Sequence, residues 1–211
     1  SALAGSLPVI ELTANTAKGF SICRWNGTST DGATIAHGLG TAPSVIITKG
    51  LSNATSWVVG IGGISGFGAS DYLSLNSNNG LLNSTTFYQA YGSDTFTVGV
   101  SSANEMNKTG NGYVSYCFAE ISGYSKFGSY TGNGGSQAID VGFPPAVVLL
   151  KRTNSSSWGI FDNTRQPANT GLQYLSPNGT GAETTNANMV FSGNTFNDNG
   201  YVSDSGTTVL Y

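Results

Sequence analysis

Charge is scarce in this sequence. Only 9% of its 211 residues are Asp, Glu, Lys or Arg, and eight scattered basic residues against eleven acidic ones give a net charge of −3. A protein that neutralises a phosphate backbone carries clustered Lys and Arg, so we expect no nucleic-acid partner. No apolar run approaches the roughly 18 to 20 residues that a membrane-spanning helix needs, so we expect no membrane insertion.

Residues that commonly carry out catalysis are also few. The one histidine, His37, lies in the turn "AHGLG", and the sequence has no G-x-S-x-G nucleophile turn. The carboxylates form no recognisable pair of the kind that hydrolyses glycosides. The loop "FNDNGYVSDSG" contains Asp198 and Asp204 but lacks the central Gly and final Glu of an EF-hand, so it is a weak match to a calcium site. We therefore expect no enzymatic activity, no metal site and no cofactor.

The two cysteines, Cys23 and Cys117, lie outside any C-x-x-C or Cys/His metal pattern. Each is flanked by apolar or aromatic residues, in "FSICRW" and "YVSYCFAE", which is typical of buried free thiols. A disulfide between the first and last strands of one unit is the alternative. The sequence leaves this choice open.

The residues that are abundant indicate β-structure. The chain has 30 Gly, 10 Phe, 10 Tyr and 3 Trp, which is enough aromatic and apolar area for a core. Short apolar or alternating runs, separated by clusters of Gly, Asn and Ser, predict an all-β fold of the β-sandwich or jelly-roll type. In "YVSYCFAEI", for example, Tyr113, Ser115 and Cys117 are expected on one face of a strand, with Val114 and Tyr116 on the other. The predicted strands are 19–25, 33–36, 44–49, 56–61, 71–75, 94–100, 112–121, 126–130, 137–141, 146–151, 157–161, 172–176, 188–192, 195–203 and 207–211.

The sequence also resembles itself at a shift of about 100 residues, which indicates an internal repeat. Several independent matches occur in the same order along the chain, so a duplication explains them better than chance does. The matching stretches are "APSVIITKG" (42–50) with "PPAVVLLKR" (144–152), Trp57 with Trp158, and "YLSLN" (72–76) with "YLSPN" (174–178).

The repeat divides the chain into an N-terminal extension, 1–19, and two tandem β-sandwich or jelly-roll-like repeats, 20–122 and 123–211. Nothing in the second repeat corresponds to "CFAEI", so either its last strand is short or the chain is cut there. The segment 7–12 lies outside both repeats and is expected to fill a strand position. It would do so within its own chain or, as donor-strand exchange, in a neighbouring chain.

Residues that recur in both repeats are expected to serve the fold, because both repeats must fold. We therefore predict that Trp57 and Trp158 face inward, and that Lys49 and Lys151 end their strands as solvated or edge-protecting charges. Aromatic loop residues that do not recur are better candidates for ligand binding. Phe67 and Tyr88 are accordingly predicted as stacking platforms for a glycan, with packing at the edge of the core as the alternative.

Four stretches carry a resemblance to known proteins: "GFSICRWNGT", "IAHGLGTAPSVIITK", "SYCFAEISGYSKFGSYTGNG" and "GFPPAVVLLKR". They resemble a repeat family found in tail and virion structural proteins of marine bacteriophages, cyanophages among them. The resemblance covers nearly all of the chain from Gly19 onward, and "CFAEISGYSKFGSYTGNG" is its most specific part. It implies a β-rich module of a virion appendage and supplies no catalytic residues.

These observations predict a structural or adhesive module of a phage tail fibre, spike or similar extracellular filament, located in the virion. The expected partners are other copies of the chain in a homo-oligomer, other virion proteins and host surface polysaccharide. Two alternatives remain open. One is a carbohydrate-binding module without a structural role, and the other is a polysaccharide-degrading enzyme domain.

Overall fold

A computed structural model describes residues 5–165, 172–186, 189–200 and 204–211, and these residues form an all-β protein of antiparallel sheets. Among them, the only helical element is the single 3₁₀ turn Thr16–Lys18. Each predicted strand overlaps an observed one, although residues 188 and 201–203 of two predicted strands lie outside the described part. The chain divides into two compact units, Ser1–Leu75 with Leu81–Ile121, and Asn76–Gly80 with Ser122–Tyr211.

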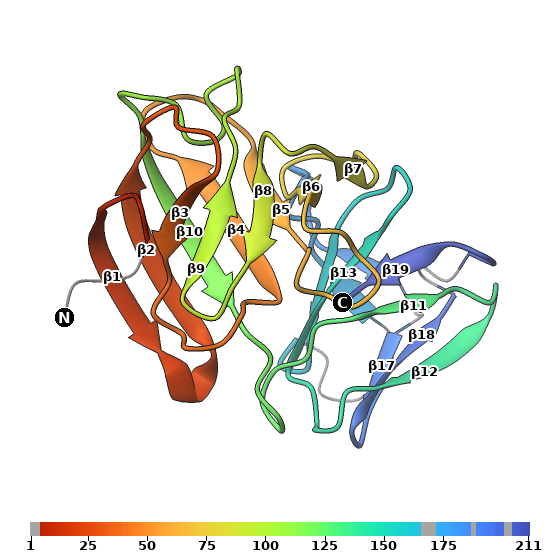
Figure 1. Ribbon diagram of the computed structural model, residues 1–211. Helices are drawn as coiled ribbons and strands as arrows, with labels where there is room; N and C mark the ends of the chain where they lie inside the picture. Colours follow the sequence, from red (N-terminus) through yellow and green to blue (C-terminus); the bar gives the residue numbers. More distant parts are fainter. Residues whose placement is uncertain (1–4, 166–171, 187–188, 201–203) are drawn as a thin grey trace. The chain divides into compact units, whose positions relative to one another are not determined.

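The larger sheet of the first unit has the strand order β1-β2-β10-β4-β5-β6-β7, with antiparallel neighbours throughout (Figure 1). Burial alternates along β10, where Tyr113, Ser115 and Cys117 are buried and the residues between them are half-buried, as predicted. The N-terminal segment pairs with β2 of its own chain, which is the first of the two arrangements expected for it. The strands are β1 (Val9–Asn15), β2 (Phe20–Asn26), β10 (Gly112–Phe118), β4 (Val45–Gly50), β5 (Trp57–Gly60), β6 (Asp71–Ser74) and β7 (Leu82–Asn83).

A smaller sheet completes the first unit, in the order β3 (Ala33–Ala36), β9 (Thr95–Val98) and β8 (Tyr88–Tyr91). In Figure 1 this sheet lies over one face of the larger one. The hydrophobic core between them takes Trp25, Ile46 and Cys117 from the larger sheet and Ile35 and Phe96 from the smaller. The unit is therefore sandwich-like, with one apolar layer between two sheets.

A chain of hydrogen bonds crosses this core. The indole Nε1–H of Trp25 donates to Ser115 Oγ over 3.0 Å, and the hydroxyls of Ser115 and Thr48 are 2.8 Å apart. The hydroxyl of Tyr88, on the opposite sheet, donates to Thr48 Oγ1 over 2.8 Å. All four side chains are fully buried. Since a buried polar group without a partner costs about 1–3 kcal/mol, these bonds favour one alignment of the two sheets.

Both cysteines are free thiols on the core side of the first unit, with no exposed surface. Cys23 lies opposite Ser115 and Cys117 opposite Ser21, so the two thiols are diagonal neighbours on adjacent strands. Burial, followed by the hydrogen bond with Cys23, raises the pKa of the Cys117 thiol. A thiol with a raised pKa is a poor nucleophile, so Cys117 is suited to packing rather than to chemistry.

The second unit is built from the sheets β11-β19-β13-β14, β15-β16 and β12-β18-β17. An isolated bridge between Ile160 and Leu175 joins β14 to the chain next to β15. Its core contains Leu150, Phe161 and Phe196. The strands are β11 (Ser129–Thr131), β12 (Ser136–Asp140), β13 (Val147–Arg152), β14 (Gly159–Asp162), β15 (Leu172–Tyr174), β16 (Thr184–Asn186), β17 (Met189–Ser192), β18 (Thr195–Asn199) and β19 (Thr208–Leu210).

Trp57 does not face the core of the first unit, contrary to the prediction for it. Trp57 lies opposite Lys49, on the outer face of the larger sheet, and stacks on Tyr116 with the ring centroids 6.3 Å apart. It is half-buried, whereas Trp158, with only 4% of its surface exposed, is one of the buried hydrophobic residues, in line with the prediction for it. The alternation of β5 therefore directs Trp57 outward, and its recurrence in the sequence does not reflect a place in the core.

The recurring lysines also differ from the prediction. Lys151 is fully buried, and its ammonium donates to the carbonyls of Arg152 and Asn154 over 2.7 and 3.0 Å. Lys49 donates in the same way to the carbonyl of Thr55 over 2.7 Å. Both lysines therefore close the loop of a β-hairpin by hydrogen bonds to its backbone, and they do not end their strands as solvated charges.

Candidate functional site

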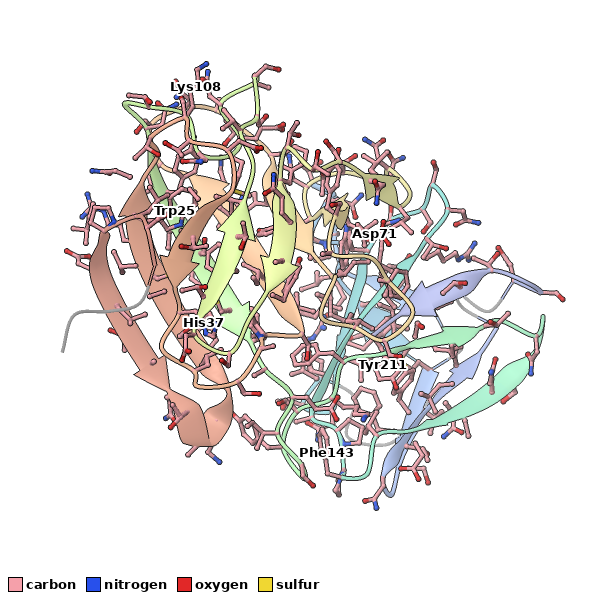
Figure 2. All side chains as sticks on the ribbon, viewed as in Figure 1. Trp25, His37, Asp71, Lys108, Phe143 and Tyr211 are labelled. Atoms are coloured by element: carbon pink, nitrogen blue, oxygen red, sulfur yellow. The ribbon has the colours of Figure 1, made fainter. Side chains whose placement is uncertain are left out.

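Three connections meet at one end of the first unit: 27–32 after β2, 51–56 after β4 and 99–111 before β10. They meet because β2, β10 and β4 are adjacent antiparallel strands, with Gly112 opposite Asn26 and Tyr113 opposite Gly50. Lys108 marks this end in Figure 2, and we call the three segments the loop end. Connections as long as 99–111 are uncommon in compact domains and often carry function.

Asn107 holds two of these loops together. Its side chain is fully buried, with Oδ1 accepting from the Thr28 amide over 3.0 Å and Nδ2 donating to the Thr30 carbonyl over 2.7 Å. Its own carbonyl accepts from the Ser29 amide over 2.8 Å. Asn107 adopts the left-handed conformation, φ 53°, which asparagine tolerates better than most residues. The amide therefore acts as an internal clamp that gives 27–32 and 99–111 one defined shape.

A stacked aromatic pair forms the floor under the loop end. The rings of Trp25 and Tyr113 lie 4.6 Å apart and are nearly parallel. The hydroxyl of Tyr113 donates to the Asn104 carbonyl over 3.0 Å and accepts from the Lys108 amide over 2.9 Å. Met106 fills the space beneath the loop with no exposed surface. The loop 99–111 is thus anchored at several points along its length.

The outward surface of the loop end offers hydroxyls and amides. Thr109 donates through its amide and its hydroxyl to Ser29 Oγ, over 3.0 and 3.1 Å. Asn53 donates to Asn111 Oδ1 over 2.7 Å, which connects 51–56 to 99–111. Neutral groups held in fixed positions suit the hydrogen bonding of a neutral polar ligand rather than bond-making chemistry. The sequence motifs do not predict this surface, and the signal that points to it is the unmatched length of 99–111.

The two residues predicted as glycan platforms lie elsewhere. Tyr88 is fully buried, and its hydroxyl bonds to Thr48 inside the core, so it offers no face to a sugar. This prediction is wrong because β8 turns the ring inward between the two sheets. Phe67 is half-buried in the connection 61–70 after β5, at the end of the unit opposite the loop end. Asp71 shapes that connection by accepting from the Gly68 amide over 2.8 Å.

The acidic residues of the second unit that come together are neutralised by arginine. Arg165 bonds to the carboxylates of both Asp162 and Glu183. Hydrogen bonds from the backbone and then the guanidinium of Arg165 lower the pKa of Asp162. A glycosidase instead needs one carboxyl with a raised pKa as its acid. This cluster is therefore arranged as a structural ion pair.

The two aspartates of the loop that weakly matches a calcium site, Asp198 and Asp204, bond to other residues. Asp198 is fully buried and accepts from the Tyr130 hydroxyl over 2.8 Å and from the Gly200 amide over 3.1 Å. Asp204 pairs with the guanidinium of Arg152. Within the described residues no group of three or more His, Cys, Asp or Glu is arranged to hold a metal ion. The same residues include no helix with the length and hydropathy needed to cross a membrane.

These features define the class of the molecule as an all-β, sandwich-like protein with one preorganised polar loop end. A family model, described as a domain of unknown function, DUF7483, matches residues 4–211. The chain therefore belongs to this family. No curated protein and no solved structure matches it significantly.

Proposed function

We propose that the protein is a structural and adhesive module of a bacteriophage virion appendage, built from two tandem β-sandwich repeats. The observation that carries this proposal is the strand order of the two units. The order β2-β10-β4-β5 in the first has the counterpart β11-β19-β13-β14 in the second, and β3-β9-β8 has the counterpart β12-β18-β17. A repeated module is a common way to build an extended filament.

The registers of the two units support the same proposal. Trp57 pairs with Lys49, and Gly159 pairs with Leu150, so Trp158 and Lys151 occupy the positions of Trp57 and Lys49. The bridge between Ile160 and Leu175 likewise aligns Tyr174 with the position of Tyr72 next to Gly60. The sequence matches therefore have comparable registers in the two units, which supports the proposed duplication.

The assignment to a phage particle rests on the resemblance of the sequence to virion proteins, and on the low charge and short strands expected of such modules. Its test is localisation. Antibodies raised against the recombinant protein should label an appendage of the purified particle in electron micrographs, and its peptides should be found in the particle by mass spectrometry. If purified particles lack the protein, the proposal fails.

Assembly is part of the proposal, because fibres and spikes are oligomers. The recombinant protein, measured by light scattering over a range of concentrations, should form a trimer or an open head-to-tail polymer. A trimer favours a fibre or spike, and an open polymer favours a filament subunit. If the protein is a monomer at every concentration, the proposed homo-oligomer is contradicted.

Carbohydrate binding is the second candidate function, and the loop end is the observation that favours it. A glycan array separates the possibilities, since a purely structural module should give no signal. If glycans bind at the loop end, Asn53→Ala and Thr109→Ala should weaken the signal, while Thr13→Ala, an exposed threonine on β1, should not. Loss of signal in Phe67→Ala alone would move the site to the opposite end.

Enzymatic cleavage of polysaccharide is not part of this proposal. The Asp162–Arg165–Glu183 cluster is neutralised within itself. A reducing-sugar assay on host polysaccharide should therefore give no release above the blank. Release that depends on the folded protein would contradict the proposal in favour of a degrading enzyme.

A further inference from the structure

His37 is the only histidine of the chain, and the structure buries it completely in the connection between β3 and β4. Both ring nitrogens have partners. The Leu39 amide donates to Nδ1 over 3.3 Å, and Nε2 lies 3.1 Å from the Gly92 carbonyl. An amide can only donate and a carbonyl can only accept, so the ring must be neutral with its proton on Nε2.

The ring joins two loops at the end of the first unit opposite the loop end, where Figure 2 labels His37. One loop is 37–44, between β3 and β4, and the other is 92–94, between β8 and β9. The backbone also joins them, through the His37 amide and the Asp94 carbonyl at 3.2 Å. The side chain therefore adds a second, chemically different connection between the same two loops.

The second unit provides an internal comparison. There the Val141 amide donates to the Asn194 carbonyl over 2.9 Å, in the same place relative to β12 and β18. Valine has no ring nitrogen, so this backbone connection forms without an imidazole. The scaffold thus accepts an apolar side chain at this position, and the histidine of the first unit is an addition to it.

Protonation would break one of the two hydrogen bonds of the ring and would add a buried charge, while the bond from Nε2 to the Gly92 carbonyl would remain. A proton on Nδ1 would turn the acceptor of the Leu39 amide into a second donor that faces it, and it would place a positive charge in a buried site. The charged side chain that acts on the ring, among the described residues, is Asp94 from the other loop, and it is exposed. Asp94 is thus positioned to pair with an imidazolium that leaves the interior.

We propose that His37 is an acid-sensitive latch: the neutral ring holds the loops 37–44 and 92–94 together, and protonation releases them. Burial lowers the pKa of His37 from its ordinary value of 6.5, against the opposing effects of the Gly92 hydrogen bond and of Asp94. Because the folded pKa is the lower one, the unfolded or opened state takes up the proton first. The stability from the latch is therefore complete above the ordinary pKa and is lost as the pH falls below it.

The single histidine makes the test direct. In the full protein, ¹⁵N spectra of the imidazole should show the Nε2–H tautomer at about pH 7.5 and titration below the ordinary histidine pKa. Hydrogen exchange of the Leu39 amide, corrected for the intrinsic effect of pH, should lose about tenfold or more of its protection on acidification to about pH 5. A ring that titrates at or above the ordinary value would overturn the proposal.

His37→Val is the matched control, because it is the residue that the second unit uses. The variant should keep the fold, and the protection of its Leu39 amide should no longer change with pH. If it does not fold, His37→Asn can still accept from the Leu39 amide and does not titrate, so it serves the same purpose. Equal acid loss of protection in the native protein and in the control would show that another group is responsible.

Discussion

The hydrogen-bonded chain in the first core leads to the sharpest prediction of stability. In Ser115→Ala, the indole Nε1–H of Trp25 loses its acceptor while the ring remains fully buried. Thr48 keeps the hydroxyl of Tyr88 as a partner, so Trp25 carries most of the loss. An orphaned buried donor costs about 1–3 kcal/mol, so we expect the variant to lose about 2 kcal/mol of unfolding free energy.

The expected loss of unfolding free energy comes from the indole N–H of Trp25, which is left without an acceptor, and not from the removal of the Ser115 hydroxyl itself. In a Trp25→Phe background there is no indole N–H to strand, so Ser115→Ala should then cost less than about 1 kcal/mol. The coupling energy of this double-mutant cycle should accordingly be at least about 1 kcal/mol. Thr48→Val is a milder comparison, since Tyr88 retains the carbonyls of Ile46 and Val58 at 3.3 and 3.2 Å.

The two compact units require an assay that reports on the first alone. Urea denaturation followed by circular dichroism measures the overall transition, and hydrogen exchange with mass spectrometry resolves the peptides of β2 and β10. The loss of free energy should appear in those peptides and leave β13 and β14 unchanged. If Ser115→Ala costs the same with tryptophan or phenylalanine at position 25, the orphaned indole donor is refuted as the cause of the lost stability.

Three further predictions concern single positions. Asn107→Ala should lower the local stability of 27–32 by about 2–4 kcal/mol, because it removes two side-chain hydrogen bonds and places alanine in a left-handed conformation. Asn107→Gly should lower it less, because glycine tolerates that conformation and only the hydrogen bonds are lost. Hydrogen exchange of the loop 27–32 measures both effects. Gly60→Ala should lower the melting temperature by an amount equivalent to about 1–3 kcal/mol, since its Cβ would lie 2.5 Å from the ring of Tyr88, whereas Gly181→Ala, in open space, should have no effect. Burial and then Arg152 lower the pKa of Lys151 to about 8, against an ordinary value of 10.5. Because the unfolded state then binds more protons at this position, Lys151 should contribute a rise in stability above about pH 8, which urea titrations measure as the difference between the native protein and Lys151→Met.

The lysine measurement has a defined window. Tyr88 and Tyr130 both have pKa values raised, first of all by burial. A folded state that holds its phenolic protons more tightly than the unfolded state loses stability once unfolded tyrosines ionise, above about pH 10. Unfolded Cys117, whose pKa the fold also raises, ionises at about pH 8.5 and likewise lowers stability. The rise attributed to Lys151 must therefore be read between about pH 8 and 9.5 as the difference between the native protein and Lys151→Met. Parallel profiles of the two proteins in that interval would contradict the lowered pKa.

The sequence predicted the strands well because turns and alternation are local signals. Asn-Gly pairs mark the end of β2, the start of β10 and the end of β18, and the alternation of β10 follows directly from its residues. Strands β7, β8 and β16 were not predicted. Strand β8 was missed because "YQAY" is short and carries a bulge between Tyr88 and Ala90, which interrupts its alternation. For this reason the sequence pattern suggested a loop residue with an exposed ring at Tyr88.

The faces of residues in short hairpins were harder to predict. Trp57 opens β5, and its face is fixed by its register with Lys49 and not by any pattern within β5 itself. Its large apolar ring suggests the core, but the partner strand places it outside. The defined conformation of the loop 99–111 could not be predicted from the sequence either, because it depends on the contact of Asn107 with 27–32, which is distant in the sequence. Long-range pairings of this kind are not encoded in any local signal.

Residues that differ between the two units are the better candidates for a function, because the shared residues are needed for folding. On the proposed duplication, positions that both units keep are needed to fold the sandwich, as with Phe96 and Phe196, which lie opposite Ile35 and Ile139. The clamp of Asn107 and the imidazole of His37 lie at opposite ends of the first unit, and neither is required by the scaffold that the second unit shares. Exchanging 99–111, the longest segment of the loop end, for the shorter connection 200–207 of the second unit should therefore preserve the fold of the first unit, as judged by hydrogen exchange in β2 and β10, and abolish any glycan signal. If the fold is lost instead, the loop is part of the core architecture and its length does not indicate a binding role.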